Sequence, residues 1–265
     1  MSRPEALRTE DPFERNLLLR AILPADRQRL ARHVEPIRLK RGDVLFEPGD
    51  EVTHVLFPCE GTVATLLVTL AEGHSIETAT VGHEGAVGGV VNHGHLPAFN
   101  RAVVQIGGPA IRVATARLQE AKQESPALRN LIMRYADCLL AQVLQSVACN
   151  AVHSIEQRCA RWLLSLHDRL GTKELPITQD ILADMLGVRR SYLTAVLGGM
   201  SRNELVVLSR GKIGIRDRLA LQNSACECHG RVHAHFSAVL GTVYRADGTV
   251  AAMTSHPVEN SGRAA

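Results

Sequence analysis

The segment at residues 182–197, LADMLGVRRSYLTAVL, constrains the fold most, because it sets one glycine between two short apolar-periodic runs. Neither run is long enough to form a stable helix alone. Ala183 and Gly187 lie four residues apart and provide the small residue and the left-handed glycine that two helices need at a sharp corner. Five apolar residues are placed to hold the two helices together: Leu182, Leu186, Val188, Leu193 and Val196. With Thr178 placed to cap the first helix, the pattern predicts a helix-turn-helix.

The predicted second helix opens with two adjacent arginines and a polar surface. We expect these side chains to be exposed near its amino end: Arg189, Arg190, Ser191, Tyr192 and Thr194. In helix-turn-helix proteins the second helix lies in the major groove of DNA, and its first residues contact base edges. Arg190 is our candidate for a two-hydrogen-bond contact to guanine, whereas Arg189 is placed for a phosphate. Ser191 and Tyr192 fit either role, and for a single arginine an ordinary solvated surface is the alternative.

More polar and basic residues follow, on the end of the second helix and on a predicted hairpin around Gly211: Ser201, Arg202, Asn203, Arg210 and Lys212. We expect them to contact phosphates, which gives affinity that is sensitive to salt and blind to sequence. Residues 151–222 carry 11 Lys/Arg against 7 Asp/Glu, whereas residues 1–150 carry 16 against 17. A local positive excess is expected of a segment that faces a polyanion, although a solvated surface could also produce it.

Residues 37–114 read as short β-strands separated by turns, with glycines at Gly42, Gly49 and Gly61. Strands spaced in this way are typical of a β-sandwich or barrel. Aromatic residues make up only 3% of the chain, so its cores must be built from Leu, Val, Ile and Ala. Before this part, residues 13–33 read as short helices interrupted at Pro24.

A long helix is predicted from Thr115 to about Ala148, with Ser125 and Pro126 resembling a cap and a first-turn proline. Its apolar stripe consists of Leu128, Leu131, Ile132, Tyr135, Leu139 and Val143. Packing against a second copy of the chain would cover this stripe and is our expectation. Burial against the chain's own β domain is the alternative. A further helix at residues 154–171 starts at Ser154 and ends at Gly171.

This order of parts resembles the Crp/Fnr family of bacterial transcription regulators over about residues 15–222. The resemblance is carried by the helix-turn-helix segment and by Gly49, Gly61 and Gly85 in FEPGDEVTHVLFPCEGTV and VGHEGAVGG. It implies a cyclic-nucleotide-binding-like β-roll, a homodimer along the long helix and sequence-specific binding to a palindromic operator in double-stranded DNA. It also implies RNA polymerase and a small-molecule effector, here unknown, as partners.

The predicted fold class is therefore α+β, in four parts. A β-roll sensor domain occupies residues 15–114 and a dimerisation helix residues 115–150. A winged helix-turn-helix occupies residues 151–222. The C-terminal extension at residues 223–265 begins as a helix, and we expect it to be disordered after about Arg245, where Gly, Ala and Ser are frequent.

The effector-binding positions depart from those of the relatives that bind cyclic AMP. The resemblance places the Gly-Glu pair of those relatives at Gly89-Val90, and their Arg-Ser pair at Asn100-Arg101. The ribose-binding carboxylate and the phosphate-binding hydroxyl are thus replaced, although Arg101 could still hold an anion. An iron–sulfur cluster would need cysteines near the amino end, whereas the first one is Cys59. We therefore expect neither cyclic AMP nor an iron–sulfur cluster.

Two histidine- or cysteine-containing segments offer other functions. Cys226 and Cys228, followed by His229, His233 and His235, could make a metal or redox sensor, but no second Cys pair completes a usual zinc knuckle. His93 and His95 have the spacing of metal ligands in β-roll enzymes, but the expected glutamate is missing. We expect no metal site and no enzymatic activity, with Cys138, Cys149 and Cys159 as small core residues.

No apolar run reaches the roughly 18 residues of a membrane span. The amino terminus lacks the apolar segment of a secretory signal. The six cysteines are scattered rather than arranged as a disulfide framework. We therefore expect no membrane partner and a cytoplasmic location.

Overall fold

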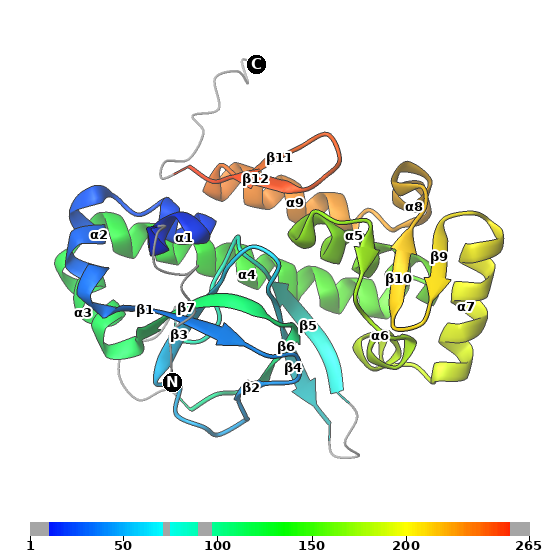
Figure 1. The fold of residues 1–265 in the computed structure, drawn as a ribbon, viewed down its shortest axis with the longest axis horizontal. Coiled ribbons are helices and arrows are strands. Elements are labelled where there is room, and N and C mark those ends of the chain that lie inside the picture. Colours follow the sequence, from blue (N-terminus) through cyan, green and yellow to red (C-terminus); the bar gives the residue numbers. More distant parts are fainter. Residues whose placement is uncertain (1–10, 71–74, 90–96, 255–265) are drawn as a thin grey trace.

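The computed structural model describes residues 11–70, 75–89 and 97–254. A β-roll and a winged helical part lie side by side, and one long helix runs behind both (Figure 1). A C-terminal helix and hairpin lie along the other side of this long helix. None of the helices in the described residues is long and apolar enough to cross a membrane.

The β-roll consists of two antiparallel sheets that face each other. Three strands form the sheet in the order β1 (Val34–Leu39), β7 (Gly108–Ala114) and β3 (His54–Pro58). Four strands form the other sheet, in the order β2 (Val44–Phe46), β6 (Arg101–Ile106), β4 (Val63–Thr69) and β5 (Ser75–Val81). Gly49 and Gly61 have φ angles of 91° and 81°, so the turns predicted from them need glycine. Short strands with turn glycines therefore made the β-rich part predictable.

From residue 11 to the start of the roll the structure has four short helical segments: η2 (Pro12–Arg15), α1 (Leu17–Arg20), α2 (Pro24–Leu30) and η3 (Ala31–His33). Pro24 is the first residue of α2, where its missing N–H costs nothing. Asn16 is fully buried; its side-chain amide donates to the carbonyls of Pro58 and Gly85 at 2.8 and 2.9 Å. This buried amide fixes the helical segment on the roll.

The predicted long helix is two helices, α3 (Thr115–Glu124) and α4 (Pro126–Val152), which meet at Ser125. The Ser125 hydroxyl accepts from the Leu128 amide at 3.1 Å, and Pro126 occupies the first turn, as the sequence predicted. The break at Ser125 lets α3 fold back on the roll while α4 runs on for 27 residues. One helix of that length spans both halves of the molecule.

The apolar stripe that we expected to meet a second copy is mostly covered by the chain itself. Leu128, Leu131, Ile132 and Tyr135 are all at most 3% exposed, and they belong to one core with the roll and the N-terminal helices. The Tyr135 hydroxyl donates to the Ala86 carbonyl at 2.8 Å. Leu139 packs on another roll cluster, and Val143 is half-buried. The alternative of burial against the β domain is therefore correct for most of the stripe.

The winged helical part contains α5 (Ile155–Leu170), β8 (Glu174–Leu175), α6 (Gln179–Leu186), α7 (Arg190–Arg202), β9 (Val206–Ser209), β10 (Lys212–Ile215) and α8 (Arg218–Ser224). Ser154 and Gln157 form a capping box at the start of α5, and Gly171 ends it with a φ of 65°. The winged part shares a core with the roll, because Val63 and Leu67 pack in the same cluster as its leucines. The two halves are thus packed together.

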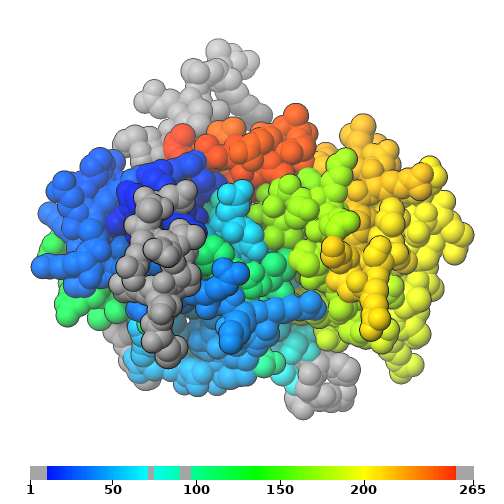
Figure 2. Space-filling view, in the orientation of Figure 1, coloured from blue at the N-terminus to red at the C-terminus, as the bar shows by residue number. Residues whose placement is uncertain are grey.

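The C-terminal extension is ordered further than the sequence indicated. Helix α9 (Cys228–Leu240) is followed by a hairpin of β11 (Val243–Tyr244) and β12 (Val250–Ala252), so the prediction of disorder after Arg245 is wrong for residues 245–254. Phe236, Leu240 and Met253 are buried in the main core, which small residues around them did not reveal. In the space-filling view this orange and red segment lies between the blue N-terminal helices and the yellow winged part (Figure 2).

Candidate nucleic-acid interface

The corner between α6 and α7 has the geometry that its sequence requires. The Thr178 hydroxyl accepts from the Ile181 amide at 3.3 Å and caps α6. Gly187 ends α6 with a φ of 67°, a left-handed conformation that costs other residues about 1–2 kcal/mol. Ala183 is 2% exposed at the crossing of the helices. Each residue that predicted the helix-turn-helix thus has its expected position.

A buried arginine supports this corner from α5. The Arg158 guanidinium donates to the Leu186 carbonyl at 2.8 Å, and the residue is 8% exposed. Leu186 is the last residue of α6, so its carbonyl has no partner within the helix and carries the negative end of the helix dipole. Arg158 therefore satisfies an acceptor at the turn itself. Sequence patterns gave no sign of this contact.

The leading end of α7, defined here as Arg189, Arg190, Ser191, Tyr192 and Thr194, is exposed. Arg190 forms an ion pair with Asp180 of α6 at 3.0 Å, with its side chain still 67% exposed. The Thr194 hydroxyl donates to the Gln179 side chain at 3.0 Å. These contacts orient polar side chains on one outward surface, next to the positive amino end of a 13-residue helix. Such a surface favours a negatively charged partner.

The other predicted phosphate contacts surround this end. Arg210 is exposed at the tip of the β9–β10 hairpin, where Gly211 has a φ of 75°. Lys212 forms an exposed ion pair with Glu174 at 2.8 Å. The hydrogen bond from Lys212 lowers the pKa of the Glu174 carboxyl. Arg202 and Asn203 are exposed at the carboxyl end of α7, and Ser201 is half-buried. The hairpin therefore forms a wing with available basic side chains.

Three of the predicted effector-binding residues, Gly89, Asn100 and Arg101, lie in the described part of the chain. Gly89 lies against α3, where the Gln119 amide donates to its carbonyl at 2.8 Å. Arg101 instead forms an ion pair with Glu47 at 3.1 Å. The Asn100 amide donates to the Arg101 carbonyl at 3.3 Å. Val90, His93 and His95 lie outside the described residues. Within residues 11–70, 75–89 and 97–254, no hydrogen bond or ion pair joins Gly89 to Arg101.

Arg101 also lines a cavity that the roll shares with the helix-turn-helix. Leu67 and Ser75 contribute from the roll, and the segment from Gly187 to Arg190 contributes from the corner. A methyl group on Gly187 would lie 3.5 Å from Ile76 of β5. The β-roll and the leading end of α7 are therefore neighbours in this structure.

The structure brings cysteines and histidines into two clusters. Cys226 and Cys228 lie with Cys149 and His153, which the sequence analysis did not select as partners. The available signal was the four-residue spacing of Cys149 and His153 at a helix end. The second cluster contains Asp168, His229 and His233.

The second cluster is a satisfied polar network. Asp168 lies 2.6 and 3.0 Å from His229 and His233, and Arg218 donates to it at 2.8 Å. Burial opposes ionisation of Asp168, but hydrogen bonds from the histidines outweigh it and lower the pKa of this carboxyl. A guanidinium so close would repel a cation. His235 instead contacts Asp137 of α4 at 2.8 Å.

Known proteins share these features. Residues 157–224 match the Crp-like helix-turn-helix domain family. The "Global nitrogen regulator" of Synechococcus elongatus is 24% identical over 194 residues, which cover 69% of this chain and 86% of that relative.

Solved structures share the fold. A Crp/Fnr-family transcriptional regulator from Eubacterium rectale has a TM-score of 0.62 at 20% identity and covers 78% of this chain and 96% of its own. FixK2 from Bradyrhizobium japonicum has a TM-score of 0.64 at 14% identity and covers 73% of this chain and 98% of its own. The chain is therefore a DNA-binding transcription regulator that carries a Crp-like helix-turn-helix domain, and its fold is shared with structures of Crp/Fnr-family regulators.

Proposed function

We propose that this regulator binds a palindromic operator as a homodimer, with α7 of each protomer in a major groove. The observation that carries the proposal is the exposed leading end of α7, held by the Thr178 cap and the Gly187 corner. Arg190 would read guanine, and Arg189 would contact phosphate. Arg202, Arg210 and Lys212 would contact the flanking backbone. Ser191, Tyr192 and Thr194 would set the remaining base preference.

A second stripe on α4 supports the homodimer. Besides Val152 at the very end of α4, four large apolar side chains of this helix are at least 49% exposed: Met133, Leu140, Leu144 and Val147. Their spacings of seven, four and three residues repeat as in a coiled-coil seam. They lie on the face turned away from the roll, so a partner's α4 could cover them. Two protomers related in this way would present their α7 helices to the two half-sites of a palindrome.

The β-roll is proposed to bind a small-molecule effector, and RNA polymerase is proposed as the partner at promoters. Cyclic AMP is not proposed, because the positions that would hold its ribose and phosphate differ in the sequence. The roll and the helix-turn-helix corner line one cavity, next to Arg101. A ligand that changed the conformation of the roll would therefore also move the helix-turn-helix. An effector would therefore act by differential binding to two arrangements of these halves.

Selection of binding sites from a random double-stranded library tests this function. The purified chain should enrich a motif with two-fold symmetry and half-sites about one helical turn apart. Light scattering should give the mass of two chains for the free protein. A chain that is monomeric and enriches no motif at low salt would contradict the proposal.

A further inference from the structure

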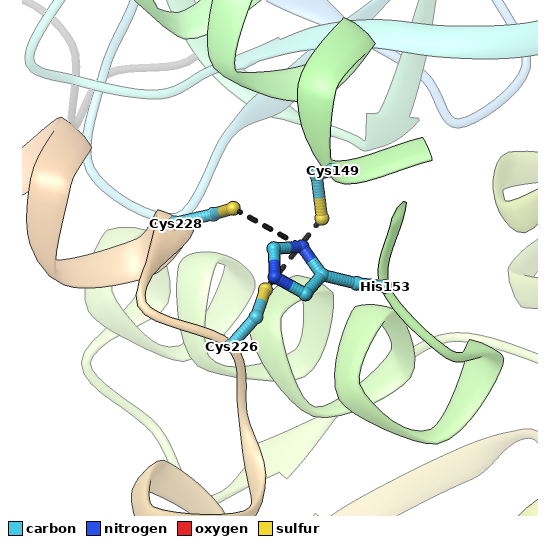
Figure 3. Close-up of side chains that lie close together, drawn as sticks. All are labelled: Cys149, His153, Cys226 and Cys228. Atoms are coloured by element: carbon cyan, nitrogen blue, oxygen red, sulfur yellow. Dashed lines mark hydrogen bonds between the residues drawn. The ribbon is translucent and has the colours of Figure 1, made fainter. Parts of the chain in front are cut away.

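Two segments that are distant in sequence bring four metal-binding side chains together (Figure 3). Cys149 lies in the last turn of α4, and His153 is the residue directly after that helix. Cys226 and Cys228 come from the start of the C-terminal extension, where α9 begins. We call these four residues the Cys/His cluster. It is outside the DNA-binding surface, and the proposed function does not use it.

The spacing of the ligand atoms in the Cys/His cluster fits one tetrahedral ion. The three sulfur atoms and one ring nitrogen all lie within 4.8 Å of one another. The Sγ atoms of Cys149 and Cys226 are 3.6 Å apart, and Cys228 Sγ lies 3.5 Å from His153 Nδ1. Zinc–sulfur bonds of about 2.3 Å and zinc–nitrogen bonds of about 2.0–2.1 Å give tetrahedral edges of roughly 3.5–3.8 Å. These two separations match the edges of such a site, and all the other pairs lie within 4.8 Å.

Burial shields the three cysteines of the cluster from solvent, and His153 is half-buried at its edge. Cys149 and Cys228 are fully buried, Cys226 is 5% exposed, and the three cysteines form a cluster apart from the aliphatic cores. A single buried cysteine is explained as a small apolar residue, but that does not explain three thiols that converge on an imidazole. A disulfide would need sulfur atoms about 2.05 Å apart. Four closed N and S ligands are the donor set of structural zinc sites.

A second layer of contacts holds the ligands in place. His153 Nε2 lies 3.2 Å from the Glu227 carboxylate, which leaves Nδ1 free of its proton to face the sulfurs. The Gln145 amide donates to Cys228 Sγ at 3.0 Å. A carboxylate behind a ligating histidine is usual in zinc proteins.

Buried Arg161 places a positive charge beside Cys149. Three thiolates around a divalent ion would leave one negative charge, which Arg161 can balance. An iron–sulfur cluster distributes its cysteines over two or more irons, whereas these ligands are close enough for one. The site therefore favours a single thiolate-preferring ion such as Zn²⁺.

We propose that Cys149, His153, Cys226 and Cys228 bind one zinc-class divalent ion that fastens the C-terminal extension to the junction of α4 and α5. Binding would release the thiol protons that remain, and it would close a loop of more than seventy residues between α4 and α9. At this junction the long helix α4 ends and α5, the first helix of the winged part, begins. The ion would thus hold the extension at the point from which the winged part is oriented.

Metal analysis of the full chain, purified without oxygen, tests the site. One zinc ion per chain is expected, and titration with Co²⁺ should give thiolate charge-transfer and tetrahedral visible bands. Cys149→Ala and Cys228→Ala should lose the stoichiometric metal and these bands. Cys59→Ala, which removes a buried thiol of the roll outside the cluster, should keep both. Glu227→Gln should weaken metal binding by about 10–100-fold.

A second measurement needs only the wild-type chain, in case the cysteine variants misfold. Zn²⁺ should protect Cys149, Cys226 and Cys228 from alkylation, and chelation should expose these three before the other cysteines, as mass spectrometry can locate. Metal that stays bound in Cys149→Ala would overturn the proposal. Failure of reduced wild-type chain to bind Zn²⁺ or Co²⁺ would also overturn it, as would a Cys149–Cys226 disulfide in the chain purified under reducing conditions. None of these readouts uses DNA, so they are independent of the operator assay.

Discussion

Arg190 and Lys212 each have an acidic partner on the protein surface, with which DNA must compete. Arg190 contacts Asp180 at 3.0 Å, and Lys212 contacts Glu174 at 2.8 Å. Both pairs are exposed, and such pairs contribute only about 0–1 kcal/mol. DNA phosphates and bases can therefore compete for both cations. Arg190 is the first residue of α7, whereas Lys212 lies in β10 of the wing.

Arg190→Ala should flatten the base preference at one position of each half-site. A bidentate arginine–guanine contact contributes about 1–3 kcal/mol of discrimination, so the ratio of specific to altered-site affinity should fall about 5–150-fold. Fluorescence anisotropy with matched oligonucleotides measures this ratio. Arg231→Ala, which removes an exposed charge from α9, is the control and should leave it unchanged. An unchanged ratio in Arg190→Ala would assign base reading to another side chain.

Lys212→Ala should weaken binding to all sequences alike. A phosphate contact releases about one counterion, so the slope of log affinity against log salt should become shallower by about one. Anisotropy at several salt concentrations gives this slope. If the variant changes base preference but keeps the slope, the wing has a different role from the one proposed here.

At the scale of elements, the helix caps could be predicted from the sequence, but the part of the molecule that packs on each helix face could not. Ser154, Gly171, Thr178 and Gly187 each mark a helix end in the sequence, because cap chemistry is local. The apolar periodicity of α4 shows which residues share a face, but not what covers it. Leu128 and Leu140 both look like interface residues, yet the chain's own core buries the first and leaves the second 55% exposed.

Leu140→Asp with Leu144→Asp should therefore dissociate the proposed dimer. Burying one leucine contributes about 1.5–3 kcal/mol, so self-association should weaken by at least about tenfold. Sedimentation velocity across a concentration series measures the change. Leu219→Asp introduces the same charge at an exposed leucine of α8 and should leave the dimer intact. Equal dissociation in both variants would contradict a seam along α4.

Two glycines, Gly198 inside α7 and Gly187 at the end of α6, make another test of element stability. Gly198 lies in the helix without a left-handed φ, and a methyl group there would meet only the Arg202 guanidinium at 3.6 Å. Gly198→Ala should raise the free energy of unfolding by about 0.5–1 kcal/mol. Gly187→Ala should lower it by about 1–2 kcal/mol, because its φ is 67°. Urea unfolding of both variants checks the opposite signs.

At the scale of the whole molecule, the extension joins all the other parts. Helix α9 contacts α4 through Asp137–His235 and Arg134, and the Cys/His cluster reaches the start of α5. The sequence showed the chemistry of Cys226 and Cys228, but it could not show that Cys149 and His153 come from 75 residues upstream. Long-range convergence of this kind depends on the packing of α9, which small residues in the tail did not reveal.

A fall in pH should destabilise the C-terminal extension before the rest of the chain. His233 stacks on Tyr244 with ring centroids 3.8 Å apart and faces Asp168, His229 and Arg169. Burial lowers the pKa of His233, so the unfolded state takes up a proton at higher pH than the folded one. Stability from this residue is complete above its ordinary pKa of about 6.5 and is lost as pH falls below that value. The hydrogen-exchange protection factors of α9, which are corrected for the intrinsic pH dependence of amide exchange, should fall between pH 7 and 5, and less so in His233→Gln. An equal fall in both chains would assign the effect elsewhere.

The closeness of Gly187 to Ile76 has a consequence for coupling within one protomer. The bend that orients α7 lies beside strand β5 of the β-roll, so a shift of that strand would act directly on the leading end of α7. A conformational change in β5 could then reach α7 without acting along the length of α4. A bulkier residue in place of Gly187 would have two effects: it would distort the bend, and it would separate the β-roll from the winged part.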